Sequence, residues 1–308
     1  MRKICVPALL AVLAFGAAPV TTIRAAETVE AAAAGTPESA ILLPVKVLRG
    51  NDFKGFYQLL PPEDKAKAEA DWKKAQDDRK AGAKPKDTSE INALLAKLLA
   101  PDAVDQLMKE NEPKLAQANP QELSQGLQMA AGFLPMMLGQ PQPGQTPEQA
   151  KSKQALGAML QGMLTDASGW ILTAGINDPK KLRSATERLV AGARALGVKN
   201  VEELQALSFE DFLGRLGPLV KEAKSAAAVY DVQVDGFLDS VKAVAKPALP
   251  GAVADERALD VSFTAFGKPY TFPVTVLKKG TNWIISPKNG EQFSGMKQMI
   301  PGAGGDAP

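Results

Sequence analysis

Oxygen-bearing side chains recur at short spacing in the sequence DVQVDGFLD, which begins at Asp231. Asp231, Gln233 and Asp235 alternate with valine, Gly236 follows at the place of a sharp turn, and Asp239 adds a further carboxylate. This order matches the first part of the calcium-loop pattern D-x-[DN]-x-[DN]-G, in which side-chain oxygens surround a hard cation. The segment therefore predicts a calcium site with these four oxygen-bearing side chains as ligands.

The same segment departs from the calcium pattern where negative charge matters most. It resembles part of an EF-hand loop, but Lys242 stands at the position of the bidentate glutamate and Gln233 is neutral. The alternative interpretation is a loop in which Asp235 caps a helix that runs through Leu238, Val241 and Val244. We expect no cofactor, with calcium as the alternative, and both interpretations of the segment are kept.

The remaining catalytic chemistry is limited by the residue types that the chain lacks. It has no histidine and a single cysteine, Cys5, so histidine-dependent triads and imidazole metal sites are excluded. No nucleophile elbow, phosphate-binding loop or dinucleotide fingerprint is present. Adjacent carboxylates such as Glu202 and Glu203 diverge on a helix, so a carboxylate-based hydrolase would need residues from distant segments. We expect a non-catalytic protein, with such a hydrolase as the alternative.

The first 25 residues have the three parts of a secretory signal. Arg2 and Lys3 precede an apolar run from Val6 to Val20, and small residues follow, which favours cleavage after Ala25. The run is too short for a membrane span, which needs about 20 apolar residues. We therefore expect a periplasmic or secreted protein with no transmembrane anchor and, because Cys5 is removed, no disulfide.

Cleavage also changes the net charge. The formal charge of +2 includes three basic residues and no acidic residue from positions 1–25, so the exported chain carries −1. Nucleic-acid binding needs a basic surface, and a near-neutral chain argues against it. The predicted partners are an envelope protein or an apolar small molecule.

Helical patterns extend over residues 37–250 and predict about ten helices. Side chains that cap a helix precede several of them, namely either Asn51 or Asp52, and Asp178, Asn200 and Ser208. The charged stretch after Pro62 has one inward aromatic residue, Trp72, which predicts either a docking surface or an exposed helix with one anchor. Residues 26–36 are expected to be a flexible leader, and residues 288–308 a mostly disordered tail.

Methionines gather in two successive helices that the sequence predicts to form an αα-hairpin. From Met129 to Leu138 the chain is apolar nearly all round, which predicts a helix buried on several sides. Methionine fills irregular cores and also lines adaptable apolar grooves. Beside ordinary core packing, we therefore consider a carrier or chaperone site for an apolar ligand, lined by Met129, Phe133, Met136, Met159 and Met163.

Residues 251–287 change to the two-residue period of β-strands. Alternating runs around Leu259–Ala265, Phe272–Val276 and Trp283–Ile285, separated by turn residues, predict a three-strand antiparallel meander. Three strands leave an apolar face that needs a cover, and the amphipathic helix after Ser208 is a candidate. The predicted fold is α+β, helix-dominated, with the C-terminal meander packed on helices. The predicted function is binding or envelope interaction without catalysis.

Export is directly testable. Protein recovered from the periplasm or medium should begin at Ala26, as measured by N-terminal sequencing and intact mass. Leu13→Arg, which places a charge within the apolar run, should retain most of the chain as precursor in the cytoplasm. Full-length protein that keeps Met1 outside the cytoplasm would contradict the predicted cleavage.

Overall fold

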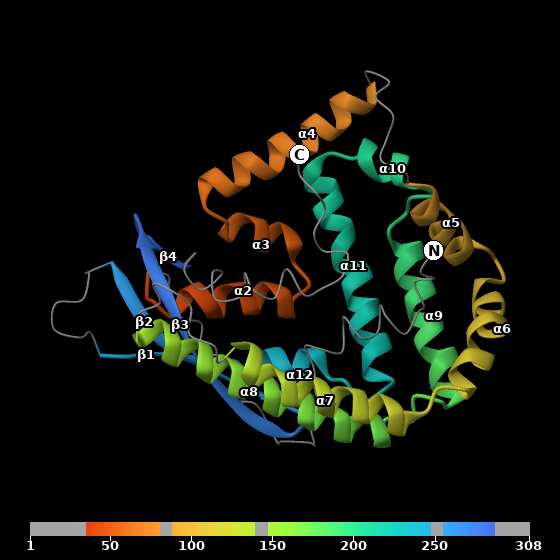
Figure 1. Ribbon diagram of the computed structural model, residues 1–308. Coiled ribbons are helices and arrows are strands. Elements are labelled where there is room, and N and C mark those ends of the chain that lie inside the picture. The colour runs from red at the N-terminus through yellow and green to blue at the C-terminus, as the bar shows by residue number, and fades with distance from the viewer. Residues whose placement is uncertain (1–34, 81–87, 139–146, 248–254, 287–308) are drawn as a thin grey trace. The chain divides into compact units, whose positions relative to one another are not determined.

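The computed structural model describes residues 35–80, 88–138, 147–247 and 255–286 (Figure 1). These residues form eleven helices and four strands, so the predicted helix-dominated α+β class is confirmed. The predicted signal, nearly all of the leader and the C-terminal tail lie outside the described residues.

The helices follow one another along most of the described chain, before the strands begin. In chain order they are α2 (Ser39–Arg49), α3 (Phe53–Leu59), α4 (Pro62–Lys80), α5 (Ser89–Leu99), α6 (Ala103–Ala116), α7 (Pro120–Leu138), α8 (Pro147–Thr173), α9 (Pro179–Ala195), α10 (Val201–Ala206), α11 (Phe209–Ala228) and α12 (Val234–Asp239).

The predicted capping residues begin the expected helices. The side chain of Asp52 accepts a hydrogen bond from the backbone N–H of Gly55, and Asp178 accepts one from Lys180. Asn200 and Ser208 cap α10 and α11 in the same way. Each cap satisfies one of the N–H groups that the first helical turn leaves without a partner, which is why these starts were readable from sequence.

The described chain divides into two compact units. The first contains residues 46–80, 88–120 and 171–238, and the second contains residues 35–45, 121–138, 147–170, 239–247 and 255–286.

The first unit is helical, and α9 and α11 pack against each other within it. Val190 on α9 joins Ala103 and Leu107 of α6 in a buried cluster. Trp72 on α4 stacks on Phe212 of α11, with ring centroids 4.6 Å apart, and its indole N–H donates to the carbonyl of Leu207 at 3.1 Å. Trp72 is therefore an anchoring aromatic residue, the second of the two interpretations given for it.

The second unit contains an antiparallel sheet in the order β1-β2-β3-β4. Its strands are β1 (Lys242–Ala245), β2 (Glu256–Ala265), β3 (Lys268–Lys279) and β4 (Asn282–Ile285). The three predicted strands are present. The helix predicted to run through Leu238, Val241 and Val244 is present as α12 and includes Leu238. Its predicted extension is wrong, because α12 ends at Asp239 and β1 pairs Val244 with Asp260.

One face of this sheet is buried. The cross-strand pairs Leu259–Val274, Val261–Phe272 and Phe263–Tyr270 lie on that face. Leu259 is fully buried, and burying such a side chain contributes about 1.5–3 kcal/mol. The start of α2 belongs to this unit as well, and Glu38, the residue before α2, accepts a hydrogen bond from Ala245 N–H at 3.1 Å.

The cover of the buried face comes from α8. A Cβ atom added at Gly162 would lie 3.3 Å from the ring of Tyr270. The ring centroids of Trp170 on α8 and Phe266 are 6.3 Å apart. The helix after Ser208, considered above as a candidate cover, is α11. In the structure α11 packs against α9 and α3 of the first unit.

The edge of β3 next to β4 is paired along only part of its length. Within the described residues β4 covers Val276–Lys279, and Ser286 N–H donates to the Thr275 carbonyl. Residues two apart along a strand direct their backbone groups to the same edge, so Pro273 and Pro269 share this edge with Thr275. Proline has no N–H, so the open part of the edge offers few donors.

Gly217 is required by a close backbone approach in the first unit. A Cβ atom at this position would lie 2.6 Å from the carbonyl oxygen of Asn51, and backbone cannot move aside as a side chain can. Gly217→Ala should therefore lower the free energy of unfolding by about 2 kcal/mol or more, as measured by chemical denaturation.

Gly169 is the matched control for Gly217, because it lies within α8 and a Cβ added there meets nothing within 4 Å. Gly169→Ala should leave the free energy of unfolding unchanged or raise it by up to about 1 kcal/mol, the difference in helix propensity. Equal effects of the two substitutions would show that the contact with Asn51 is unimportant.

Candidate functional site

The carboxylates of the predicted calcium segment lie beside basic side chains. Asp231, whose φ is 63°, forms an ion pair with Lys181 at 3.2 Å. Asp235 forms ion pairs with Arg49 at 3.1 Å and with Lys224 at 2.8 Å. Both carboxylates are therefore paired with basic side chains of the protein.

Lys224 links Asp235 to α2. Its ammonium group also donates to the carbonyl of Leu48 in the last turn of α2, and its side chain is only 11% exposed. Gln233, a predicted ligand, is exposed, and Asp239 ends α12. Across the described ranges no group of three or more His, Cys, Asp or Glu side chains is placed to hold a metal ion. The ion pairs of Asp235 connect α12 to α2 and α11. Calcium binding stays a prediction.

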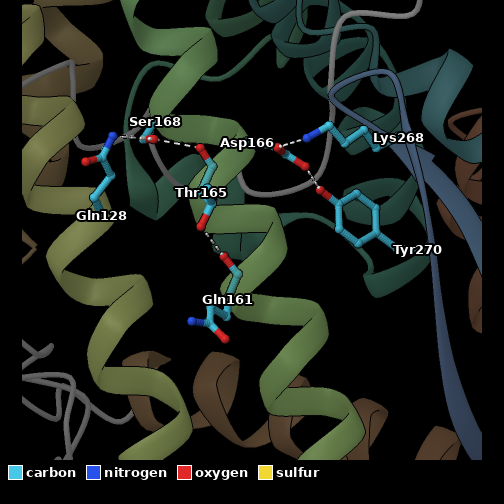
Figure 2. A network of polar contacts seen from close by, with 7 residues as sticks. All are labelled: Gln128, Gln161, Thr165, Asp166, Ser168, Lys268 and Tyr270. Atoms are coloured by element: carbon cyan, nitrogen blue, oxygen red, sulfur yellow. Dashed lines mark hydrogen bonds and ion pairs between the residues drawn. The ribbon is translucent and has the colours of Figure 1, made fainter.

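A second polar cluster joins α8 to β3 in the second unit (Figure 2). The hydroxyl of Tyr270 donates to one carboxylate oxygen of Asp166, and the ammonium group of Lys268 donates to the other at 2.5 Å. The Asp166 side chain is 13% exposed, whereas that of Lys268 is 64% exposed. Both oxygens of a nearly buried carboxylate therefore have donors, which is what makes its burial tolerable.

The environment of Tyr270 holds it in the neutral form. Burial raises the pKa of this phenol, and the hydrogen bond to Asp166 and the negative charge of that carboxylate raise it further. A neutral phenol that donates to a carboxylate is a stable pair with no proton to release near neutral pH. The cluster therefore positions α8 on the sheet, and its phenol is not a general acid near neutral pH.

A further chain of hydrogen bonds links α7 to α8. Gln128 on α7 donates to the hydroxyl of Ser168 at 3.3 Å, and Ser168 donates to the Thr165 carbonyl at 2.6 Å (Figure 2). Ser168 is buried, so the contact with Gln128 marks the side of α8 against which α7 lies. Residues two apart on a helix point about 200° apart, so Ser168 and Asp166 lie on opposite sides of α8.

The outer side of α7 carries three large apolar side chains that remain in solvent. Met129 is 62% exposed, Phe133 56% and Met136 60%. They stand at i, i+4 and i+7, so they form one line along the helix. We call these three residues the α7 stripe. Ser124 and Ala131, on the opposite side of the helix, are buried.

The α7 stripe contradicts the expectation that Met129–Leu138 is buried on several sides. The two other predicted ligand residues, Met159 and Met163, are half-buried on α8. Met159 precedes Gly162 by three positions and Asp166 by seven, which places it on the side of α8 that faces the sheet. The predicted apolar site is thus divided between the outer side of α7 and the inner side of α8.

The arginines of α9 are engaged in contacts within the first unit. Arg183 pairs with Asp105 at 2.9 Å and Arg188 with Glu222 at 3.5 Å. Arg194 donates to the carbonyl of Ala100 at 2.9 Å. These contacts tie α9 to α6, to α11 and to the residue after α5.

Comparison with protein-family models, with curated proteins and with solved structures gave no match. Among the described helices, none has the length and apolar character needed to cross a membrane.

The contact between Tyr270 and Asp166 leads to a prediction of stability and pH dependence. Tyr270→Phe should lower the free energy of unfolding at pH 7 by about 2 kcal/mol, because it removes a hydrogen bond to a charged acceptor. The folded-state pKa of Tyr270 is raised above the unfolded value of about 10, so its stabilising contribution is complete below pH 10 and declines as pH rises further. The difference between wild type and variant should therefore shrink above pH 10, as measured by urea denaturation across pH.

Lys268→Met is the control for Tyr270→Phe, because the Lys268 ammonium contacts the same carboxylate from solvent. Its loss should cost less than about 1 kcal/mol, as is usual for exposed ion pairs. A larger loss for Lys268→Met than for Tyr270→Phe would contradict the role assigned to the phenol.

Proposed function

We propose that this chain is an exported, non-catalytic binding protein that holds an apolar segment of another envelope protein against the α7 stripe. The observation that carries the proposal is the exposure of Met129, Phe133 and Met136, each more than half in solvent and aligned along one helix. A contiguous exposed apolar surface of this kind is typical of interaction sites. Methionine suits such a surface because its unbranched side chain adapts to different partners.

The shape of the α7 stripe favours a protein partner over a small molecule. Sites for small ligands bury about 70–90% of the ligand in a concave pocket. Side chains that are 56–62% exposed along one helix form a raised line. A raised line pairs with the apolar side of another helix, through anchors at i, i+3, i+4 and i+7. The carrier function considered for Met129–Met163 is therefore the second candidate.

Binding without catalysis is supported by the state of the carboxylates in the clusters described above. Asp166 accepts hydrogen bonds at both oxygens, and Asp231 and Asp235 are paired with cations. A carboxylate in such contacts is engaged in holding helices together. No specific observation favours the hydrolase alternative.

The proposed compartment rests on the sequence of residues 1–25. A charged start, an apolar run and small residues before Ala26 are the signal that export machinery recognises. In an envelope compartment the exposed α7 stripe meets other exported proteins and the apolar segments that they present during assembly.

A peptide-binding experiment tests the proposed function. The probe is a fluorescent amphipathic helical peptide of leucine and lysine, titrated with the protein and followed by anisotropy. Met129→Gln/Phe133→Ser/Met136→Gln should weaken binding by roughly tenfold or more, equivalent to about 1.4 kcal/mol. The substituted positions are exposed, so the free energy of unfolding should change by less than about 0.5 kcal/mol per residue.

The matched control removes exposed apolar side chains elsewhere. Ile91 and Leu94 on α5 are 53% and 45% exposed, and Ile91→Gln/Leu94→Gln should leave peptide binding unchanged. Equal losses in both variants, or no loss in the triple variant, would overturn the proposal. Binding of a long-chain fatty acid that depends on Met159 and is insensitive to the α7 stripe would instead favour the carrier function.

A further inference from the structure

The α7 stripe has a definite length and little charge around it. Its outer members, Met129 and Met136, are seven residues apart, which on a helix corresponds to about 10.5 Å. Glu122 is the single charged residue in α7. The stripe therefore fits a short, largely uncharged apolar segment of about two helical turns.

The chain itself contains a segment with matching chemistry. Beyond β4 the sequence continues to Pro308 and includes QFSGMKQMI, residues 292–300. Phe293, Met296 and Ile300 stand at i, i+3 and i+7, so the outer members are separated by the same seven residues as those of the α7 stripe. Lys297 is the single charged residue in this segment, so no like charges would oppose each other across the contact.

We propose that the C-terminal segment 293–300 docks on the α7 stripe of its own chain. β4 and the stripe belong to the same compact unit. Six residues, 287–292, separate the end of the described chain from Phe293, and six residues span up to about 20 Å. A short tether of this kind gives the segment an effective concentration in the millimolar range, which favours the chain's own segment over that of a second copy.

Docking in cis would regulate the proposed binding site. While segment 293–300 occupies the α7 stripe, an external apolar segment must displace it, so the apparent affinity for the partner is the intrinsic affinity multiplied by the fraction of time that the stripe is free. This consequence rests on the proposed function. The docking itself does not, because it concerns two parts of one chain.

A cross-linking experiment tests the docking. The sequence has one cysteine, Cys5, which the predicted cleavage removes or Cys5→Ser replaces. Phe133→Cys and Met296→Cys place one thiol at the centre of each partner, and cysteine keeps a small apolar side chain there. Oxidation should give an intramolecular disulfide in the monomer, identified by mass spectrometry after proteolysis.

The control pairs Met296→Cys with Ala130→Cys. Ala130 is also exposed on α7 but lies about 100° around the helix from Met129. The Phe133 pair should form its disulfide at least about fivefold faster than this control. Equal rates would overturn the proposal, since they mean that the segment samples the helix at random. Disulfide-linked dimers as the main product would also overturn it, in favour of a second copy.

Hydrogen exchange provides a measurement without added cysteines. Phe293→Ser/Ile300→Ser in the full chain should increase amide exchange in residues 129–136 severalfold, whereas Ser294→Ala/Gln298→Ala should not. Unchanged exchange in the first variant would contradict the docking. Neither the cross-linking nor the hydrogen-exchange experiment uses an external peptide. If they show no docking, the peptide-binding result is unaffected. If the peptide does not bind, the docking result is likewise unaffected.

Discussion

The second unit depends on the contact between the α8 carboxylate and the β3 phenol. The four-stranded sheet has one apolar face, which must be covered. α8 covers this face, and Gly162 leaves room there for the ring of Tyr270. The ring reaches across to Asp166, and Lys268 completes the neutralisation of the carboxylate. A polar contact within an apolar interface fixes the position of the helix along the strand, which apolar packing alone does less precisely.

This arrangement explains why the α7 stripe is exposed. One side of α8 is occupied by the sheet, and Ser168 on the opposite side receives the hydrogen bond from Gln128 of α7. α7 is therefore the outer layer among the described parts of its unit, and its side with Ser124 and Ala131 is covered. Its other side is apolar by sequence and exposed by position, and this combination makes it the candidate site.

The sequence predicted the features that depend on neighbouring residues. Helix caps such as Asp178 and the strand alternation around Leu259–Ala265 are local signals, and the structure contains both. The pairing of Asp166 with Tyr270 joins residues 104 positions apart, so no local pattern revealed it. The apolar run from Met129 predicted burial on several sides, and this was wrong for the α7 stripe. The sequence shows that a side of a helix is apolar, but it does not show whether a neighbour covers that side. β1 was missed because four residues are too few to display a period.

The prolines on the open edge of β3 have a consequence for the life of the chain before it is folded. While a chain folds, its exposed strands can recruit those of other chains into cross-β fibrils. Pro269 and Pro273 deny an incoming strand the backbone protons on which such growth depends. Self-association through this edge is therefore disfavoured.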